Sequence, residues 1–200
     1  MNEGSGGIAY DHSGRENRGV LKKADGVLPS WVSGRYNYAL DFDGVGSYVD
    51  LNDGVATSLL NFTSLNFSIE AWVKPDSLTS NPVIFQKGVV NTNGYLFRMW
   101  GTDIRFYTSQ SGASQLTYSV TGVGETNVWQ HLVVTVSGAT ARMYKNGAEV
   151  SYVAQATHIA PASSAVSGVI GCNYDHTAEF MDGSIDAVRI FNRALTAAEI

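Results

Sequence analysis

The chain has 200 residues, a formal net charge of −5, 21 glycines and only 16% charged residues. This length is sufficient to bury the core of one sizeable β-domain. The mild negative charge, without any basic stripe, gives no electrostatic basis for binding nucleic acid or an anionic membrane. No apolar run approaches the roughly 18 residues of a membrane-spanning helix, and the first residues show no secretion-signal pattern.

Short strands separated by Gly, Asn and Ser turns dominate the pattern of apolar residues. In chain order, strands are expected on both sides of an acidic turn within 39–49, and then at 67–74, 96–100, 104–107, 129–136, 141–145 and 185–191. Thr196 and Glu199 have the capping-box spacing that predicts a short helix near the end. The sequence therefore predicts an all-β fold, a two-sheet antiparallel sandwich, in a single domain over residues 1–200 with a flexible start at 1–7.

Two segments predict which side chains share a face. The strand at 67–74 alternates apolar residues with Ser, Glu, Trp and Lys, so one face belongs to the core and Glu70 lies on a solvated face. The strands at 96–100 and 104–107 are joined by a Gly-Thr-Asp turn. They form a predicted hairpin in which Arg98 and Arg105 share a face.

A series of motifs in a fixed order carries a resemblance to a known family. They are Asp11-His-Ser-Gly-Arg-Glu-Asn-Arg-Gly19, Ala39-Leu-Asp-Phe-Asp-Gly44 with Tyr48-Val49, Phe67-Ser-Ile-Glu-Ala-Trp-Val73, Trp129-Gln-His-Leu-Val133, Lys145-Asn-Gly147, and Gly183-Ser-Ile-Asp-Ala-Val-Arg-Ile-Phe191 with Arg193-Ala-Leu195. The chain resembles the laminin-G-like branch of the concanavalin A-like lectin/glucanase jelly rolls. Such modules are often appended to bacterial and phage surface proteins and to carbohydrate enzymes. The resemblance covers nearly the whole chain and implies a jelly-roll sandwich.

The resemblance also implies a structural calcium ion that ties the first and last strands together. Asp186 would supply side-chain and main-chain oxygens, the Asp43-Gly44 turn another ligand, and the loop that begins at Asp11 the rest. Calcium binds about six to eight oxygens, carbonyls and waters included, so two or three carboxylates suffice.

One departure from the family pattern and one alternative bear on this metal site. The family commonly has paired acidic residues where this chain has Gly46-Ser47. In the alternative interpretation, Asp186 caps a β-turn or pairs with Arg189 or Arg193, and Asp43 forms only an Asx-turn before Gly44.

The pattern of acidic residues argues against catalysis. Glycosidases that share this jelly roll carry two glutamates flanking an aspartate on one strand, and this chain has no Glu-x-Asp-x-x-Glu. Its glutamates are scattered, and its serines lack a nucleophile elbow. The sequence therefore predicts that the protein is not an enzyme.

Carbohydrate binding is the favoured function, because jelly rolls bind sugars with exposed aromatic faces and polar side chains. Trp100, beside a turn, and Tyr174, in a polar loop with Asp175, are the candidates for an exposed site. The side chains expected near them on the sheet are those of Tyr95, Arg98, Arg105 and Tyr107.

Two function classes follow. The first is a noncatalytic carbohydrate-binding or adhesion module, extracellular or surface-associated, with a glycan or polysaccharide as its partner and a larger parent chain. The second is a structural protein, such as a phage virion decoration or cell-surface assembly domain, that docks on a protein shell.

Overall fold

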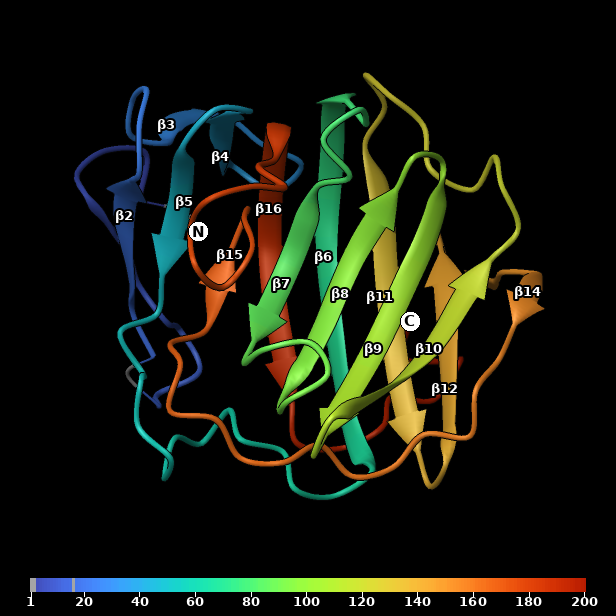
Figure 1. Ribbon diagram of the computed structural model, residues 1–200. Coiled ribbons are helices and arrows are strands. Elements are labelled where there is room, and N and C mark those ends of the chain that lie inside the picture. Colours follow the sequence, from blue (N-terminus) through green and yellow to red (C-terminus); the bar gives the residue numbers. More distant parts are fainter. Residues whose placement is uncertain (1–2, 16) are drawn as a thin grey trace.

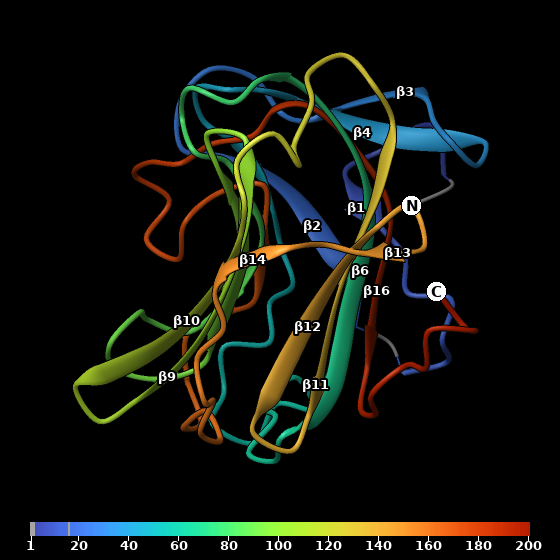
Figure 2. The same cartoon turned by 90° about the vertical axis from the view of Figure 1, so that its right-hand side faces the viewer.

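The structure, a computed structural model, describes residues 3–15 and 17–200. Two antiparallel sheets pack face to face (Figures 1 and 2). One sheet has the strand order β1 (Ile8–Ala9), β2 (Gly19–Lys23), β5 (Ser47–Asp50), β15 (Val169–Ile170), β7 (Val83–Lys87), β8 (Tyr95–Trp100), β9 (Asp103–Gln110), β10 (Ala113–Ser119) and β14 (Tyr152–Ala154). The other has the order β13 (Ala148–Glu149), β12 (Thr140–Lys145), β11 (Gln130–Ser137), β6 (Asn66–Ser77), β16 (Asp182–Phe191), β4 (Tyr38–Asp43) and β3 (Ser30–Ser33). The predicted all-β, two-sheet sandwich is confirmed.

The core lies between the sheets and is built by alternation along the strands. On β6, the alternating residues Phe67, Ile69, Ala71 and Val73 are fully buried, as the period-2 pattern predicts. On β8, the facing sheet contributes Tyr95, Phe97 and Met99 to the same cluster. Because successive side chains point to opposite faces, the residues between these core positions lie on the outer faces of the sandwich.

The predicted helix near the end of the chain is absent from the described residues, which contain no helix at all. The capping contacts do form, because the Glu199 carboxylate accepts hydrogen bonds from Thr196 N at 2.9 Å and from Thr196 Oγ1 at 3.0 Å. Only one backbone bond follows, from Glu199 N to Thr196 O. A single turn does not propagate into a helix without further backbone bonds.

Glu70 is not on a solvated face, as the sequence pattern had indicated. It points outward from β6, yet it is only 3% exposed. Its Oε1 lies 2.8 Å from Arg189 Nη1, and its Oε2 lies 3.5 Å from His131 Nε2. Burial opposes ionisation, but these two partners outweigh it and hold the pKa of Glu70 below its ordinary value. Partners from β11 and β16, distant in the sequence, therefore cover this position.

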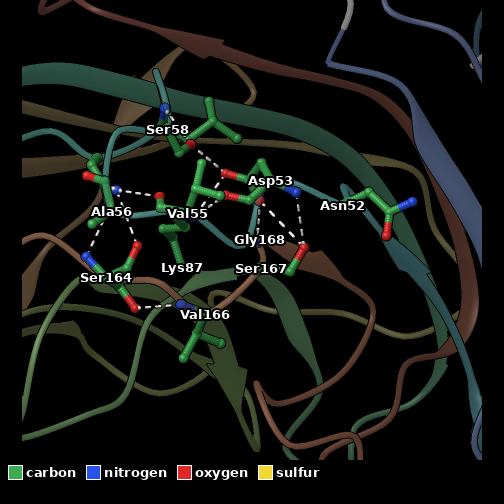
Figure 3. A network of polar contacts seen from close by, with 12 residues as sticks. Asn52, Asp53, Val55, Ala56, Ser58, Lys87, Ser164, Val166, Ser167 and Gly168 are labelled. Atoms are coloured by element: carbon green, nitrogen blue, oxygen red, sulfur yellow. Dashed lines mark hydrogen bonds and ion pairs between the residues drawn. The ribbon is translucent and has the colours of Figure 1, made fainter.

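A buried ion pair anchors the loop between β5 and β6 to the sandwich (Figure 3). Lys87 on β7 is fully buried, and its Nζ lies 2.7 Å from Asp53 Oδ2. The same carboxylate accepts hydrogen bonds from Ser58 Oγ and from Gly168 N. The segment that precedes β6 is thereby joined to β7 and to the segment that precedes β15, at one end of the molecule.

The start of the chain, expected to be flexible, makes long-range hydrogen bonds where it is described. Trp31 Nε1 donates to Gly6 O at 2.8 Å, and Leu21 N donates to Gly7 O at 2.9 Å. Residues 1 and 2 lie outside the described residues. Glycine composition alone did not reveal these bonds, because they use backbone carbonyls.

Candidate ligand-binding site

The outer face of the nine-stranded sheet brings together most of the residues predicted to bind a ligand. Arg98 and Trp100 on β8 point away from the core, between the inward-facing residues of that strand. On β9, Arg105 lies directly opposite Arg98, and Tyr107 lies opposite Leu96. The prediction that the two arginines share a face is therefore confirmed.

Tyr95 does not belong to this surface. It was expected near the arginines, but it is in the core, and its hydroxyl donates to Leu60 O at 2.8 Å. Tyr95 lies three residues before Arg98 on β8. Because side chains alternate between the two faces of a strand, Tyr95 points into the core while Arg98 points outward.

Trp100 forms the exposed centre of the surface. Its side chain is 40% exposed, and the guanidinium carbons of Arg98 and Arg105 lie 4.6 and 4.7 Å from its ring centroid. Arg105 also lies 5.2 Å from the ring of Tyr118 on β10. These cation–π contacts fix the orientation of the indole while part of it stays open to solvent.

Both arginines are held by carboxylates, which neutralise their charge. Arg98 Nη1 lies 2.8 Å from Glu179 Oε1, and its Nη2 donates to Asn81 O at 2.7 Å. Arg105 Nε lies 2.9 Å from Asp103 Oδ2. The surface around Trp100 is therefore polar and ordered but carries little net charge.

A pocket of about 250 Å³ opens beside this cluster. Its lining consists of Gln86, Val90, Leu96, Arg98, Asn173, Tyr174 and Glu179. Tyr174, predicted as a ligand-binding residue, thus lies with Arg98 in one pocket. Gln86, Asn173 and Glu179 were missed, because nothing in the local pattern indicates that strand β7 and the segment after β15 meet here.

The segment 171–181 between β15 and β16 forms one wall of the pocket and covers part of the outer face (Figures 1 and 2). Its His176 stacks on Tyr48 of β5 with ring centroids 4.2 Å apart. Asp175 is exposed and accepts hydrogen bonds from Thr177 Oγ1 at 2.7 Å and from Thr177 N at 3.3 Å. Asp175 is not in the pocket lining, and its bonds stabilise the segment itself.

Of the residues predicted to bind calcium, Asp186 is the most buried, at 1% exposure. Its Oδ2 accepts a hydrogen bond from Tyr36 N at 2.8 Å. Burial raises the pKa of Asp186 above its ordinary value, although backbone hydrogen bonds from Tyr36 and Ala187 act against the shift. Arg189 and Arg193, the alternative partners of Asp186, pair instead with Glu70 and Glu199.

Asp43 forms the Asx-type turn that the alternative interpretation described. Its Oδ1 accepts hydrogen bonds from Val45 N, Gly46 N and Ser47 N, each at 3.0 Å, and from Ser47 Oγ at 2.8 Å. Its Oδ2 accepts one from Val27 N at 3.0 Å. Burial opposes ionisation, but these bonds outweigh it and hold the pKa of Asp43 well below its ordinary value.

The Gly46-Ser47 departure from the family pattern has a structural explanation. A Cβ on Gly46 would lie 2.3 Å from the carbonyl oxygen of Asp25, so no acidic side chain fits there. Ser47 uses its hydroxyl to close the turn at Asp43. Gly44, in the same turn, has φ of 70° and donates from its N to Met181 O.

The predicted calcium ligands do not converge on one point. Asp43 is paired in register with Asp182 on β16, whereas Asp186 lies further along that strand, opposite Trp72. Asp11 and Asp186 line a common pocket of about 710 Å³, which Asp43 and Gly44 do not line.

The carboxylate of Asp11 closes its own loop and accepts bonds from Ser13 and Asn17. Residue 16 of this loop lies outside the described residues. Within the described part of the chain, no group of three or more His, Cys, Asp or Glu side chains is placed to hold a metal ion. Asp43 and Gly44 therefore do not share a site with Asp11 and Asp186 in this arrangement, and calcium binding stays a prediction.

Each glutamate that the structure describes contacts a basic side chain. The pairs are Glu3–His12, Glu70–Arg189, Glu125–Lys145, Glu149–Arg142, Glu179–Arg98 and Glu199–Arg193. They are distributed over both sheets and their loops. No helix in the described residues is long and apolar enough to cross a bilayer.

This architecture, two antiparallel sheets with a polar-aromatic surface on one outer face, is that of a lectin-like β-sandwich. The family model described as the concanavalin A-like lectin/glucanases superfamily, laminin G type, matches residues 43–200. The chain belongs to this family, as the sequence motifs had indicated. The search of curated proteins found no match.

Solved structures share the fold at low sequence identity. Domain 4 of AbnA, an extracellular arabinanase from Geobacillus stearothermophilus solved in complex with arabinotriose, is 23% identical over 94% of this chain and 89% of that one, with a TM-score of 0.67. A botulinum neurotoxin type C structure, whose cell entry depends on two ganglioside molecules, is 15% identical over 96% of this chain, with a TM-score of 0.65. The receptor-binding domain of the C/D mosaic neurotoxin is 14% identical over 94% of this chain, with a TM-score of 0.63. This chain covers 46% of each of these two neurotoxin chains, so it spans about half of their length.

Proposed function

We propose that the protein is a noncatalytic carbohydrate-binding module and that its glycan lies on the outer face of the nine-stranded sheet. The observation that carries this proposal is Trp100, a residue 40% exposed whose indole is held between Arg98 and Arg105, and Arg98 also lines a pocket. A sugar ring presents an apolar face of C–H groups and a rim of hydroxyls, which suits a fixed aromatic ring surrounded by polar groups.

The comparisons support this assignment at the level of the fold. Domain 4 of AbnA was solved with arabinotriose, and the type C neurotoxin interacts with gangliosides. Two proteins with this sandwich thus have carbohydrate ligands, although their low identity carries no residue-level correspondence to this chain. An extracellular or surface location is part of the same proposal.

The absence of catalysis is proposed from the chemistry of the glutamates. Glycoside hydrolysis uses a pair of carboxyl groups on either side of the scissile bond, one of which must bind and release a proton. The described glutamates are instead held by separate basic partners, and His131 and Arg189 lower the pKa of Glu70 although burial opposes its ionisation. Binding without bond cleavage is consistent with this arrangement.

A glycan array with the purified chain tests the proposal. The wild type is compared with Trp100→Ala and with Tyr38→Ala, a matched control on β4 of the opposite sheet whose ring is 45% exposed. We expect the wild type and the control to bind the same polysaccharide class, and Trp100→Ala to lose most of the signal. A blank array with a folded wild type would overturn the proposal and favour the alternative, assembly on a protein shell.

A further inference from the structure

The pocket beside Trp100 contains a buried acceptor that has no hydrogen-bond partner. Gln86 is only 2% exposed, and its Nε2 donates to Gly88 O at 2.8 Å. This bond fixes the amide orientation, because a carbonyl oxygen cannot donate to Gln86 Oε1. Oε1 has no partner among the described residues. Buried side-chain oxygens are nearly always paired, so this position calls for a donor.

Three of the other polar side chains of the pocket, those of Arg98, Asn173 and Glu179, have partners within the protein. Arg98 and Glu179 form an ion pair with each other. Asn173 Oδ1 accepts hydrogen bonds from Thr177 N at 3.0 Å and from Ala178 N at 3.1 Å. Val90 and Leu96 supply apolar walls. The pocket therefore offers an incoming molecule the buried, unpaired oxygen of Gln86, the side chain of Tyr174, a neutralised ion pair and an apolar side.

The volume of the pocket limits the size of its occupant. Sites for drug-sized ligands typically have volumes of about 300–1,000 Å³. At about 250 Å³, this pocket holds a single ring rather than an oligosaccharide. Arg98 lines the pocket and also contacts the indole of Trp100. One sugar residue in the pocket can thus be continuous with a neighbour on the exposed ring.

We propose that Gln86 determines the specificity of this site by accepting a hydrogen bond from a hydroxyl of a neutral sugar residue. This inference rests on the glycan-binding function proposed above. Neutral sugars are selected because Arg98 and Arg105 are paired with Glu179 and Asp103, so neither guanidinium is free to bind the carboxylate of an acidic sugar. A site that hydrogen-bonds a hydroxyl discriminates strongly against a ligand that lacks it.

The test compares wild type, Gln86→Leu and Gln110→Leu by calorimetric titration with a neutral oligosaccharide of the class identified on the array. Leu removes the acceptor and nearly preserves the side-chain volume, and Gln110→Leu is a matched control at the exposed end of β9. We expect Gln86→Leu to weaken binding about tenfold or more, and the control to bind as wild type does. Analogues with single hydroxyls replaced by hydrogen identify the group. Loss of the critical hydroxyl should weaken binding to wild type but not to Gln86→Leu.

Thermal melting separates this role from a structural one. Leu removes the unpaired oxygen of Gln86 but also the hydrogen bond from its Nε2 to Gly88 O. The two effects on stability oppose each other, so the melting temperature of Gln86→Leu should stay close to that of the wild type. If wild type binds a neutral glycan and Trp100→Ala does not, equal affinity of Gln86→Leu and wild type would overturn the inference and leave the function standing. Preference of wild type for acidic over neutral glycans would also overturn it. A wild type that binds no glycan at all would overturn both proposals.

Discussion

Replacing Lys87 by Met should be among the most destabilising single substitutions in this protein. Lys87 is fully buried on β7, and its ammonium group lies 2.7 Å from Asp53 Oδ2 (Figure 3). Met nearly preserves the length of the side chain but leaves the Asp53 carboxylate without its counter-charge. Removing one partner of a buried pair costs about 3–5 kcal/mol in the free energy of unfolding. For a domain of this size, that loss corresponds to a decrease of about 6–20 °C in melting temperature.

The substitution should also change the ionisation of Asp53. In the wild type, burial opposes ionisation of Asp53, but Lys87, Ser58 and Gly168 outweigh it and lower the pKa. Without Lys87, burial dominates and the pKa of Asp53 rises above its ordinary value. The variant should therefore lose less stability relative to wild type at pH 5 than at pH 7, because Asp53 then folds in its protonated form more readily.

Urea denaturation at both pH values measures these differences in the free energy of unfolding. The double variant Lys87→Met/Asp53→Asn is the matched control, because Asn carries no charge, keeps an acceptor for Gly168 N and can donate from its amide nitrogen to Ser58 Oγ. It should recover more than half of the stability that the single variant loses. A loss below about 1 kcal/mol in the single variant, or no recovery in the double variant, would refute the reasoning.

Two further predictions concern acid and calcium. His158 is buried between the hydroxyls of Thr108 and Thr117, and burial lowers its pKa from 6.5 to about 4. The unfolded chain therefore binds a proton below about pH 6.5 that the folded chain rejects, so roughly 3 kcal/mol of stability should be lost as the pH falls to 4. Urea titrations should show this slope in wild type and a flatter one in His158→Gln; identical slopes would exclude His158 as the cause. If the family resemblance extends to calcium, the protein should melt at a higher temperature in millimolar calcium than in EDTA. Asp186→Asn should abolish that difference, and equal wild-type melting temperatures in the two buffers would contradict calcium binding.

The sequence by itself determined the fold and part of the proposed binding surface, because both depend on local periodicity. Alternation along 67–74 placed Phe67 in the core, and the hairpin spacing placed Arg98 opposite Arg105. A two-residue period requires only that neighbouring side chains point to opposite faces, so a single sequence contains this information. The ordered motifs similarly indicated the family to which the chain belongs.

Only the tertiary structure decided which distant residues cover these faces and pair with their polar side chains. Glu179 reaches Arg98 across 81 residues, and Gln86 is buried in a pocket whose wall comes from segment 171–181. The same holds for Glu70, which a local pattern places in solvent and distant partners bury. Whether each of these polar residues is buried and paired or exposed depends on groups from distant parts of the chain. Whether a buried oxygen such as that of Gln86 is unpaired depends on all the groups around it. Several of these groups come from distant parts of the chain, so no spacing in the sequence predicts it.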